Sequence, residues 1–370
     1  MKKNAFYTTI VSICIITTAY MLNSCSTNNS EDESSMHREY LAVRPSNGST
    51  WNIIDKNGQV VVETEFRTDA SSISNVFDDV YWVRFSNGRR QLFSVNQPNQ
   101  PLLDEEAADV ADFVYCGYTF VATRNQPIRI INTKGETVAT LPESIKECRS
   151  FYKDGYALIK GEDGQFGVVD TNGKIVIEPA YTNLAPLGEG VFLAELHQFL
   201  DTQGNILGEI DHQRYMVINL GMEKGKMIVR NTSNSQCCVI DQKGEEKFAL
   251  PMAVDATYYR GGYATFKDAS GQWGVVDDDG DVVISPQYPM LFNVGGGDFI
   301  AMANGGFGVI NAKNETILNF SYGEFDTEKL GDNFVMGTGY EYMLVNRKGE
   351  QLATFKKIGQ ADHPVAYRMR

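Results

Sequence analysis

The sequence predicts an all-β protein built from about nine similar repeats of about 36 residues each. Three observations support this. A turn pattern recurs at regular spacing, apolar runs of strand length flank it, and no long stretch has helical apolar spacing. The 370 residues exceed what one compact domain needs, and 42% of them are hydrophobic, which is enough for a folded core.

Nine Asp or Asn anchors define the repeat. They stand at Asp55, Asn96, Asn132, Asp170, Asp201, Asp241, Asp277, Asn311 and Asn346, separated by 31 to 41 residues. An Ile, Val or Leu precedes each anchor, as expected of a half-buried strand. Three residues after the anchor stands Gly in seven copies and Asn in two, Asn99 and Asn314. Gly and Asn are the residues that most readily adopt positive φ, so each anchor is predicted to open a tight hairpin turn.

The anchor carboxylates are predicted to form turns and not an active site. In a type I turn, Asp at the first position accepts hydrogen bonds from nearby backbone NH groups and Gly suits the fourth position. This interpretation gives structural roles to Asp55 and Gly58, Asp170 and Gly173, Asp201 and Gly204, Asp241 and Gly244, and Asp277 and Gly280. Residues 277–281 invite comparison with a calcium loop but lack the Gly and Glu of an EF-hand, so we expect no calcium there.

A third strand precedes each hairpin, most clearly at residues 155–160 and 262–267. Each repeat is therefore predicted to be a three-stranded meander. A connection of about ten residues follows it, in which we place a short additional strand on the outer side of the repeat.

Two repeats resemble the WG-containing repeat family throughout. Phe166-Gly167 and Trp273-Gly274 are each followed by two valines, Asp, a turn, Gly, an aliphatic strand and Pro-x-Tyr. The resemblance implies a mostly bacterial family of undefined function that forms propeller-like rings or open solenoids. Because a closed ring removes exposed sheet edges, we expect a β-propeller of seven to nine blades, with an open superhelical array as the alternative. The first and last repeats both look complete, so no blade shared between the chain ends is predicted.

The amino terminus has the features of an export signal. Lys2 and Lys3 precede a mostly apolar run, and Leu22-Asn23-Ser24-Cys25 resembles a bacterial lipobox. The resemblance implies that residues 1–24 are a cleaved lipoprotein signal peptide and that Cys25 is lipidated. The alternative is an uncleaved membrane anchor with an incidental cysteine.

The rest of the chain divides into three parts. Residues 25–37 are polar and acidic, which predicts a disordered tether, and they resemble the segments that follow the lipidated cysteine in surface-exported lipoproteins of the Bacteroidetes. Residues 38–360 form the repeat domain and residues 361–370 a C-terminal tail. We expect a lipid-anchored protein of the cell envelope, at the outer membrane, with exposure at the cell surface left open.

Motifs for catalysis or metal binding are lacking. There is no nucleophile elbow, no phosphate-binding glycine loop, and the four histidines form no short metal-ligand pair. Gly295-Gly296-Gly297 is interpreted as flexible linkage. Cys237 and Cys238 are expected to be small buried hydrophobes on opposite sides of a strand, and a Cys116–Cys148 disulfide is left open. We therefore expect a protein that is not an enzyme and has no cofactor or metal.

The expected role is a binding or scaffold module. A net charge of −14 disfavours nucleic acid, so the expected partners are a membrane through Cys25 and a protein or a glycan. Tyr258, Tyr259, Tyr340 and Tyr342 fall in or near connections and are candidates to line a binding face. A propeller-based hydrolase or lyase and a purely structural envelope protein are the alternatives.

Overall fold

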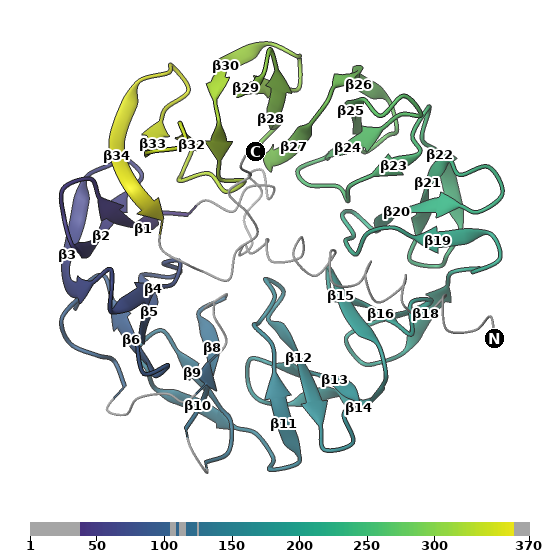
Figure 1. Cartoon of the computed structure of the whole chain (residues 1–370). Coiled ribbons are helices and arrows are strands. Elements are labelled where there is room, and N and C mark those ends of the chain that lie inside the picture. The colour runs from purple at the N-terminus through teal and green to yellow at the C-terminus, as the bar shows by residue number, and fades with distance from the viewer. Residues whose placement is uncertain (1–37, 104–108, 111–115, 124–125, 359–370) are drawn as a thin grey trace, which may run out of the picture.

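The computed structural model describes residues 38–103, 109–110, 116–123 and 126–358, and all of its regular elements are β-strands. The strands form small antiparallel sheets arranged around a central axis as the blades of a ring (Figure 1). Within a blade we call the strands A to D from the centre to the rim. In the eighth blade, for example, β27 lies near the centre and β30 at the rim (Figure 1). No helix among these residues is long and apolar enough to span a membrane.

Nine blades follow one another along the described residues. Blades 1 to 3 contain β1 (Tyr40–Pro45), β2 (Thr50–Asp55) and β3 (Val60–Arg67); β4 (Ser71–Ile73), β5 (Val80–Phe85) and β6 (Arg90–Ser94); and β7 (Asp109–Val110), β8 (Tyr118–Ala122), β9 (Arg129–Asn132) and β10 (Thr137–Thr140). Blades 4 to 6 contain β11 (Ile145–Cys148), β12 (Tyr156–Gly161), β13 (Phe166–Asp170) and β14 (Ile175–Tyr181); β15 (Leu184–Gly188), β16 (Val191–Ala194), β17 (Gln198–Leu200) and β18 (Ile206–Glu209); and β19 (Tyr215–Val217), β20 (Lys226–Asn231), β21 (Cys237–Asp241) and β22 (Glu246–Ala249). Blades 7 to 9 contain β23 (Asp255–Ala256), β24 (Tyr263–Lys267), β25 (Trp273–Asp277) and β26 (Val282–Tyr288); β27 (Leu291–Gly295), β28 (Asp298–Ala303), β29 (Gly306–Asn311) and β30 (Thr316–Tyr322); and β31 (Glu324–Phe325), β32 (Phe334–Gly337), β33 (Tyr342–Val345) and β34 (Gln351–Ile358).

The last strand closes the ring. The first half of β34 pairs with β33 as strand D of blade 9, and its second half pairs with β1 as strand A of blade 1. In Figure 1, β34 runs from the rim of the last blade to the inner edge of the first. The two end blades thus form one seven-stranded sheet. The prediction that no blade is shared between the chain ends was wrong, because strand A of blade 1 comes from the far end of the sequence.

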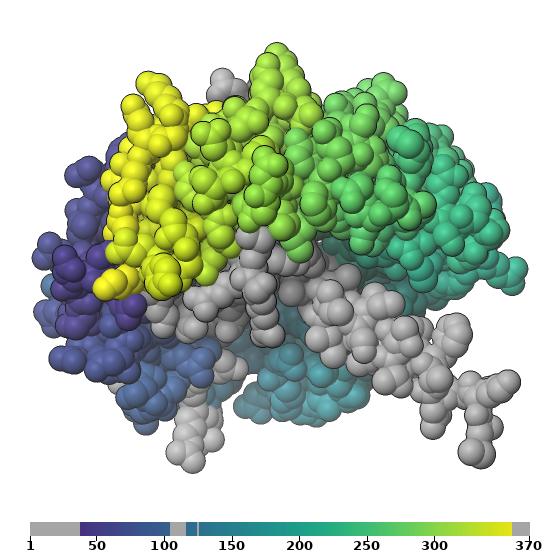
Figure 2. All heavy atoms as spheres, turned by 45° about the horizontal axis from the view of Figure 1, so that its top comes forward, coloured from purple at the N-terminus to yellow at the C-terminus, as the bar shows by residue number. Residues whose placement is uncertain are grey.

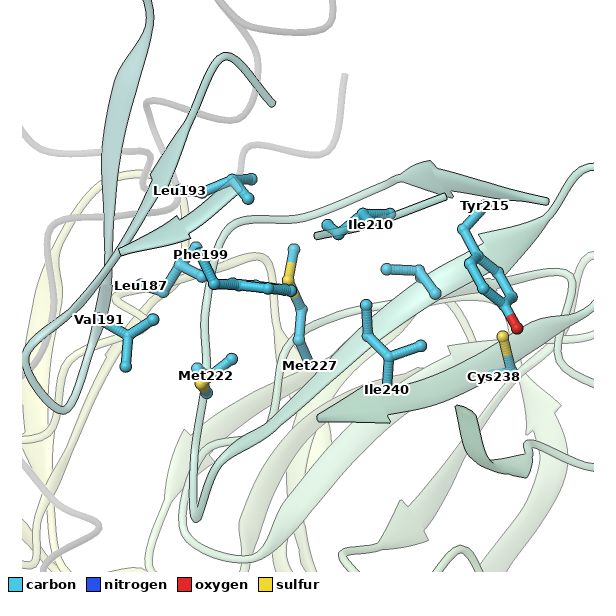
Figure 3. Packing of buried hydrophobic residues seen from close by; sticks show 11 residues of the cluster. Leu187, Val191, Leu193, Phe199, Ile210, Tyr215, Met222, Met227, Cys238 and Ile240 are labelled. Atoms are coloured by element: carbon cyan, nitrogen blue, oxygen red, sulfur yellow. The ribbon is translucent and has the colours of Figure 1, made fainter. Parts of the chain in front are cut away.

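The core consists of layers between the blades. Among the described residues nine hydrophobic clusters occur, one at each junction, and the cluster of Leu41, Val43 and Phe355 joins blade 9 to blade 1. Figure 3 shows the junction of blades 5 and 6, where Phe199 meets Met227 and Ile240. In Figure 2 the blades coloured from teal through green and yellow to purple lie directly against one another. The chain is therefore a nine-bladed β-propeller ring, within the predicted range of seven to nine.

Both faces of strands B and C are buried, as in β21, which explains why these strands read as continuous apolar runs, whereas D strands such as β10 are largely exposed. Successive side chains of a strand point to opposite faces. Cys237 therefore packs toward blade 7 and Cys238 toward blade 5, and both are free thiols buried in those clusters. Burial raises the pKa of Cys237 to about 11, so its thiol stays protonated at neutral pH.

Two details of the repeat differ from the prediction. The additional strand of each repeat lies at the centre of the ring and not on its outer side, because strand A pairs with strand B, as β11 does with β12. In blade 2 the anchor position is held by Ser94 and not by Asn96. Val80 pairs with Ser94, as Tyr156 pairs with Asp170 in blade 4. The Ser94 hydroxyl accepts from the Asn96 NH, the part played elsewhere by the Asp side chain.

Candidate functional site

The C–D turns at the anchors share one geometry. In blade 4, Gly173 NH donates to Asp170 O (3.0 Å), and the Asp170 carboxylate accepts from the NH groups of Asn172 and Lys174, both at 2.9 Å. The same two side-chain hydrogen bonds occur at seven other anchors among the described residues: Asp55, Asn132, Asp201, Asp241, Asp277, Asn311 and Asn346. Blade 2 is the exception.

Two of the turn carboxylates, those of Asp201 and Asp241, are held in the ionised form. Although burial opposes it, hydrogen bonds from the Asn205 side chain and from backbone NH groups lower the pKa of Asp201. The pKa of Asp241 is lowered in the same way, with Lys247 as the side-chain donor. An ionised carboxylate that already accepts several hydrogen bonds is poorly suited to donate a proton as a general acid.

The glycine of each C–D turn also touches the preceding blade. Gly58, Gly173, Gly204, Gly244 and Gly280 all have φ between 77° and 90°. A Cβ atom on Gly244 would lie 1.9 Å from Glu209 O in blade 5, and one on Gly58 would lie 2.8 Å from Leu352 O in blade 9. These turns are thus contact points between blades as well as hairpin ends.

The A–B turns lie on the same face of the ring as the C–D turns. Lys224, in the A–B turn of blade 6, forms an ion pair of 2.6 Å with Asp278 in the C–D turn of blade 7. Asn333, in the A–B turn of blade 9, donates to Lys56 O in the C–D turn of blade 1. We call this side the turn face. The opposite side, formed by the B–C turns and the D–A connections, is the connection face.

Carboxylates on the turn face link neighbouring A–B turns. Each accepts hydrogen bonds from backbone NH groups in the A–B turn of the next blade. The links are Asp78 to Gly117 (2.8 Å), Asp154 to Gly190 (2.9 Å), Glu189 to Lys224 and Gly225 (2.6 and 2.8 Å), and Glu223 to Gly261 and Gly262 (2.9 and 2.6 Å). Burial raises the pKa of Asp78 and of Asp154. The set was not predicted from the sequence, although an acidic residue shortly before the Gly that precedes strand B marks three of the four.

Buried charges gather where blades 8, 9 and 1 meet. The Asp298 carboxylate, 1% exposed, receives Lys329 Nζ at 3.2 Å and the Arg347 guanidinium. Arg38 holds Asp326 at 2.9 Å and also donates to Glu328 O. The Asp298 pairs join blade 8 to blade 9, and the Arg38–Asp326 pair lies at the junction of blades 9 and 1 that closes the ring.

The first described residue is fixed on the turn face. Arg38 forms a parallel bridge with Leu330 in the A–B segment of blade 9, and its carbonyl accepts from the NH of Gly331. The chain therefore enters the ring at the junction of blades 9 and 1. The predicted signal peptide, the lipidated Cys25, the tether of residues 25–37 and the tail of residues 361–370 all lie outside the described residues.

Only one of the four candidate tyrosines is fully exposed. Tyr340 is 92% exposed in a B–C turn on the connection face, whereas Tyr259 is buried. Tyr342 stacks against Phe355, and the Tyr258 ring packs against Gly221 of the preceding blade. Gly296 and Gly297 form the tight A–B turn of blade 8, both with positive φ, so the interpretation as flexible linkage was wrong.

Several solved structures overlap with this chain at low sequence identity. The ring overlaps loosely with the computationally designed Ika8 protein (TM-score 0.42, 12% identity, 81% of this chain and 100% of that chain). It overlaps similarly with BamB from Moraxella catarrhalis (TM-score 0.41, 13% identity, 79% of this chain and 95% of that chain). A third overlap is with apo AztD from Citrobacter koseri (TM-score 0.33, 14% identity, 87% of this chain and 98% of that chain).

No curated protein matches the sequence. The family described as WG containing repeat matches residues 166–197, from strand C of blade 4 into blade 5, and residues 273–306, from strand C of blade 7 into blade 8. These are the regions that start at Phe166-Gly167 and Trp273-Gly274. The chain thus carries the WG containing repeat at two places in its nine-bladed ring.

Proposed function

We propose that this chain is a lipid-anchored protein of the bacterial cell envelope, at the outer membrane, whose ring binds a protein partner through the connection face. The position of Arg38 is the observation that carries the proposal. Arg38 follows Cys25 by 13 residues, which reach at most about 45 Å when fully extended. Because the chain enters the ring at the turn face, a lipid on Cys25 holds that face toward the membrane and leaves the connection face free.

The connection face offers apolar groups for a protein interface. Tyr340 is 92% exposed in the B–C turn of blade 9, and Met252 is 56% exposed between β22 and β23. Tyr and Met are enriched in protein interfaces, since a Tyr ring is large and rigid and Met adapts to irregular surfaces. Nine junctions packed with buried side chains support these residues on a rigid ring.

The binding face is tested by site-specific photocrosslinking in the native envelope. A photoreactive amino acid replaces Tyr340 on the connection face in one variant and Asn172 on the turn face in a matched control. We expect a discrete protein adduct from position 340 and none from position 172. Adducts from position 172 alone, or from neither position, would overturn the proposal.

The lipid anchor has a separate test. Cys25→Ser should abolish incorporation of a radioactive fatty acid and release the protein from the membrane fraction. Cys116→Ser is the matched control and should keep both the label and the membrane association. Labelling that persists in Cys25→Ser would refute lipidation at this residue.

A further inference from the structure

Two histidines that are 15 positions apart in the sequence meet on the connection face of blade 5. His197 ends the B–C turn between β16 and β17, and His212 lies in the connection from β18 to β19. The Ile210 NH donates to His197 O at 2.7 Å, which places the start of this connection beside His197. The two imidazole centroids are 4.8 Å apart, and the ring planes are inclined by 59°.

The hydrogen bonding of His197 leaves one ring nitrogen available. His197 Nδ1 lies 3.0 Å from the backbone oxygen of Glu195. A carbonyl oxygen only accepts hydrogen bonds, so in the neutral imidazole Nδ1 carries the proton and Nε2 presents a lone pair. Proteins orient metal-binding histidines in this way, with the second ring nitrogen donating to a carbonyl or carboxylate.

The backbone around Glu195 holds that carbonyl in place. His197 NH donates to Ala194 O at 2.9 Å and closes the turn, while the Glu195 carboxylate accepts from the Thr182 NH at 2.6 Å. The orientation of the His197 ring is thus set by two segments of fixed backbone.

The ring separation fits two ligands of one metal ion. With Zn–N bonds of about 2.0–2.1 Å and tetrahedral angles, two ligating imidazoles have centroids roughly 5 Å apart. His212 is exposed, so little burial is gained by packing it against His197. Within the described residues no group of three or more His, Cys, Asp or Glu is arranged to hold a metal, so the described residues supply two ligands at this place.

We propose that His197 and His212 form a two-histidine binding site for a divalent transition-metal ion of the zinc, nickel and copper class. Imidazole nitrogen suits these ions, whereas calcium and magnesium prefer oxygen ligands. Water completes the coordination in the isolated protein. The site stands independently of the lipid anchor and of the protein partner.

Calorimetric titration of the full chain with ZnCl2 at pH 7.5 tests the site. We expect one saturable equivalent, and at least a tenfold loss of affinity in both His197→Asn and His212→Asn. His363→Asn is the matched control and should bind as the parent does. His212 is exposed, so His212→Asn folds normally and remains informative if His197→Asn does not. Absence of saturable binding, or binding unchanged in His212→Asn, would overturn the site.

A second measurement relies on the fact that a histidine ring binds a metal ion only as neutral imidazole. Because a proton competes with the metal for the same lone pair, zinc affinity should fall as the pH is lowered from 8 to 6. Histidine NMR signals should shift on zinc addition at His197 and His212 only. A shift confined to His37 or His363 would place the metal elsewhere and contradict the proposal.

Discussion

The glycines of the C–D turns satisfy two constraints at once. At Gly244, φ is 80° and a Cβ atom would lie 1.9 Å from Glu209 O. At Gly271, in a B–C turn of blade 7, φ is 86° but the nearest atom to a Cβ would be 3.8 Å away. Substitutions at the two positions therefore separate the free-energy cost of positive φ from the free-energy cost of a clash between blades.

Gly271→Ala should destabilise the ring by about 1 kcal/mol through backbone strain alone. Gly244→Ala carries the same strain and a clash with backbone that cannot move freely, so we expect roughly two to three times that loss. Chemical denaturation of both variants measures the difference. Equal losses of stability in the two variants would show that the contact between blades 5 and 6 accommodates the added methyl group without a free-energy cost.

The environment of Asp154 predicts that the stability of the folded protein depends on pH. Asp154 Oδ2 accepts from the Gly190 NH, but its Oδ1 is buried without a hydrogen-bond partner among the described residues, and burial raises its pKa. A carboxyl whose pKa is raised on folding destabilises the protein above the folded pKa, and this penalty vanishes as the pH falls below the unfolded value of roughly 3.9. Stability from this group therefore increases as the pH is lowered from neutral.

Asp154→Asn removes the titrating charge and leaves an acceptor for the Gly190 NH. We expect the variant to be at least as stable as the parent at pH 7, and the advantage to shrink toward pH 4. Thermal midpoints measured across this range give the difference curve. A variant whose relative stability grows as the pH falls would contradict the assigned sign.

At the level of elements, the strands that could be predicted are those whose pattern is local. The C–D hairpin has a strong signal, since its turn residues and its two apolar strands lie within about 15 residues of each other. Strand A is harder to predict, because β23 and β31 are only two residues long and have no pattern of their own. The metal-site candidates, His197 and His212, meet through the fold and have no sequence spacing that would reveal them.

The sharing of β34 between two blades could not be predicted from the sequence. Its partners β33 and β1 lie at opposite ends of the chain, and only their meeting in space shows that the eight residues of β34 serve two blades. The residues of the shared strand are those of an ordinary strand D. Phe355 shows how the strand is shared, because it pairs with Tyr342 of blade 9 and with Pro45 of blade 1.

Two truncations test the closing role of β34. Removing residues 351–370 exposes the edges of β33 and β1 and opens the cluster around Phe355, whose side chain alone is worth about 3–5 kcal/mol. We expect this variant to aggregate or to melt at a much lower temperature. Removing residues 359–370 leaves β34 complete and should change the melting temperature little. Equal behaviour of the two truncations would argue against closure by this strand.

The whole molecule is an array of repeats whose first and last blades are joined, so that it forms a closed ring. In an open array each repeat contacts only its neighbours, so the terminal repeats have one junction each and fray first. In the ring, blades 1 and 9 share the cluster of Leu41, Val43 and Phe355, and the ion pair of Arg38 with Asp326 reinforces the same junction. Each of the nine blades therefore has two packed junctions.

Hydrogen exchange distinguishes a closed ring from an open array. The strands β2, β21 and β33 occupy position C in blades 1, 6 and 9, so they compare end blades with an inner blade at the same depth. For a closed ring, opening any blade breaks two junctions, and we expect their slowest amides to exchange within about tenfold of one another. Frayed ends would instead make β2 and β33 exchange on the order of 100-fold faster than β21. That second result would mean that the junction of blades 9 and 1 opens independently and that the ring behaves in solution as an open array.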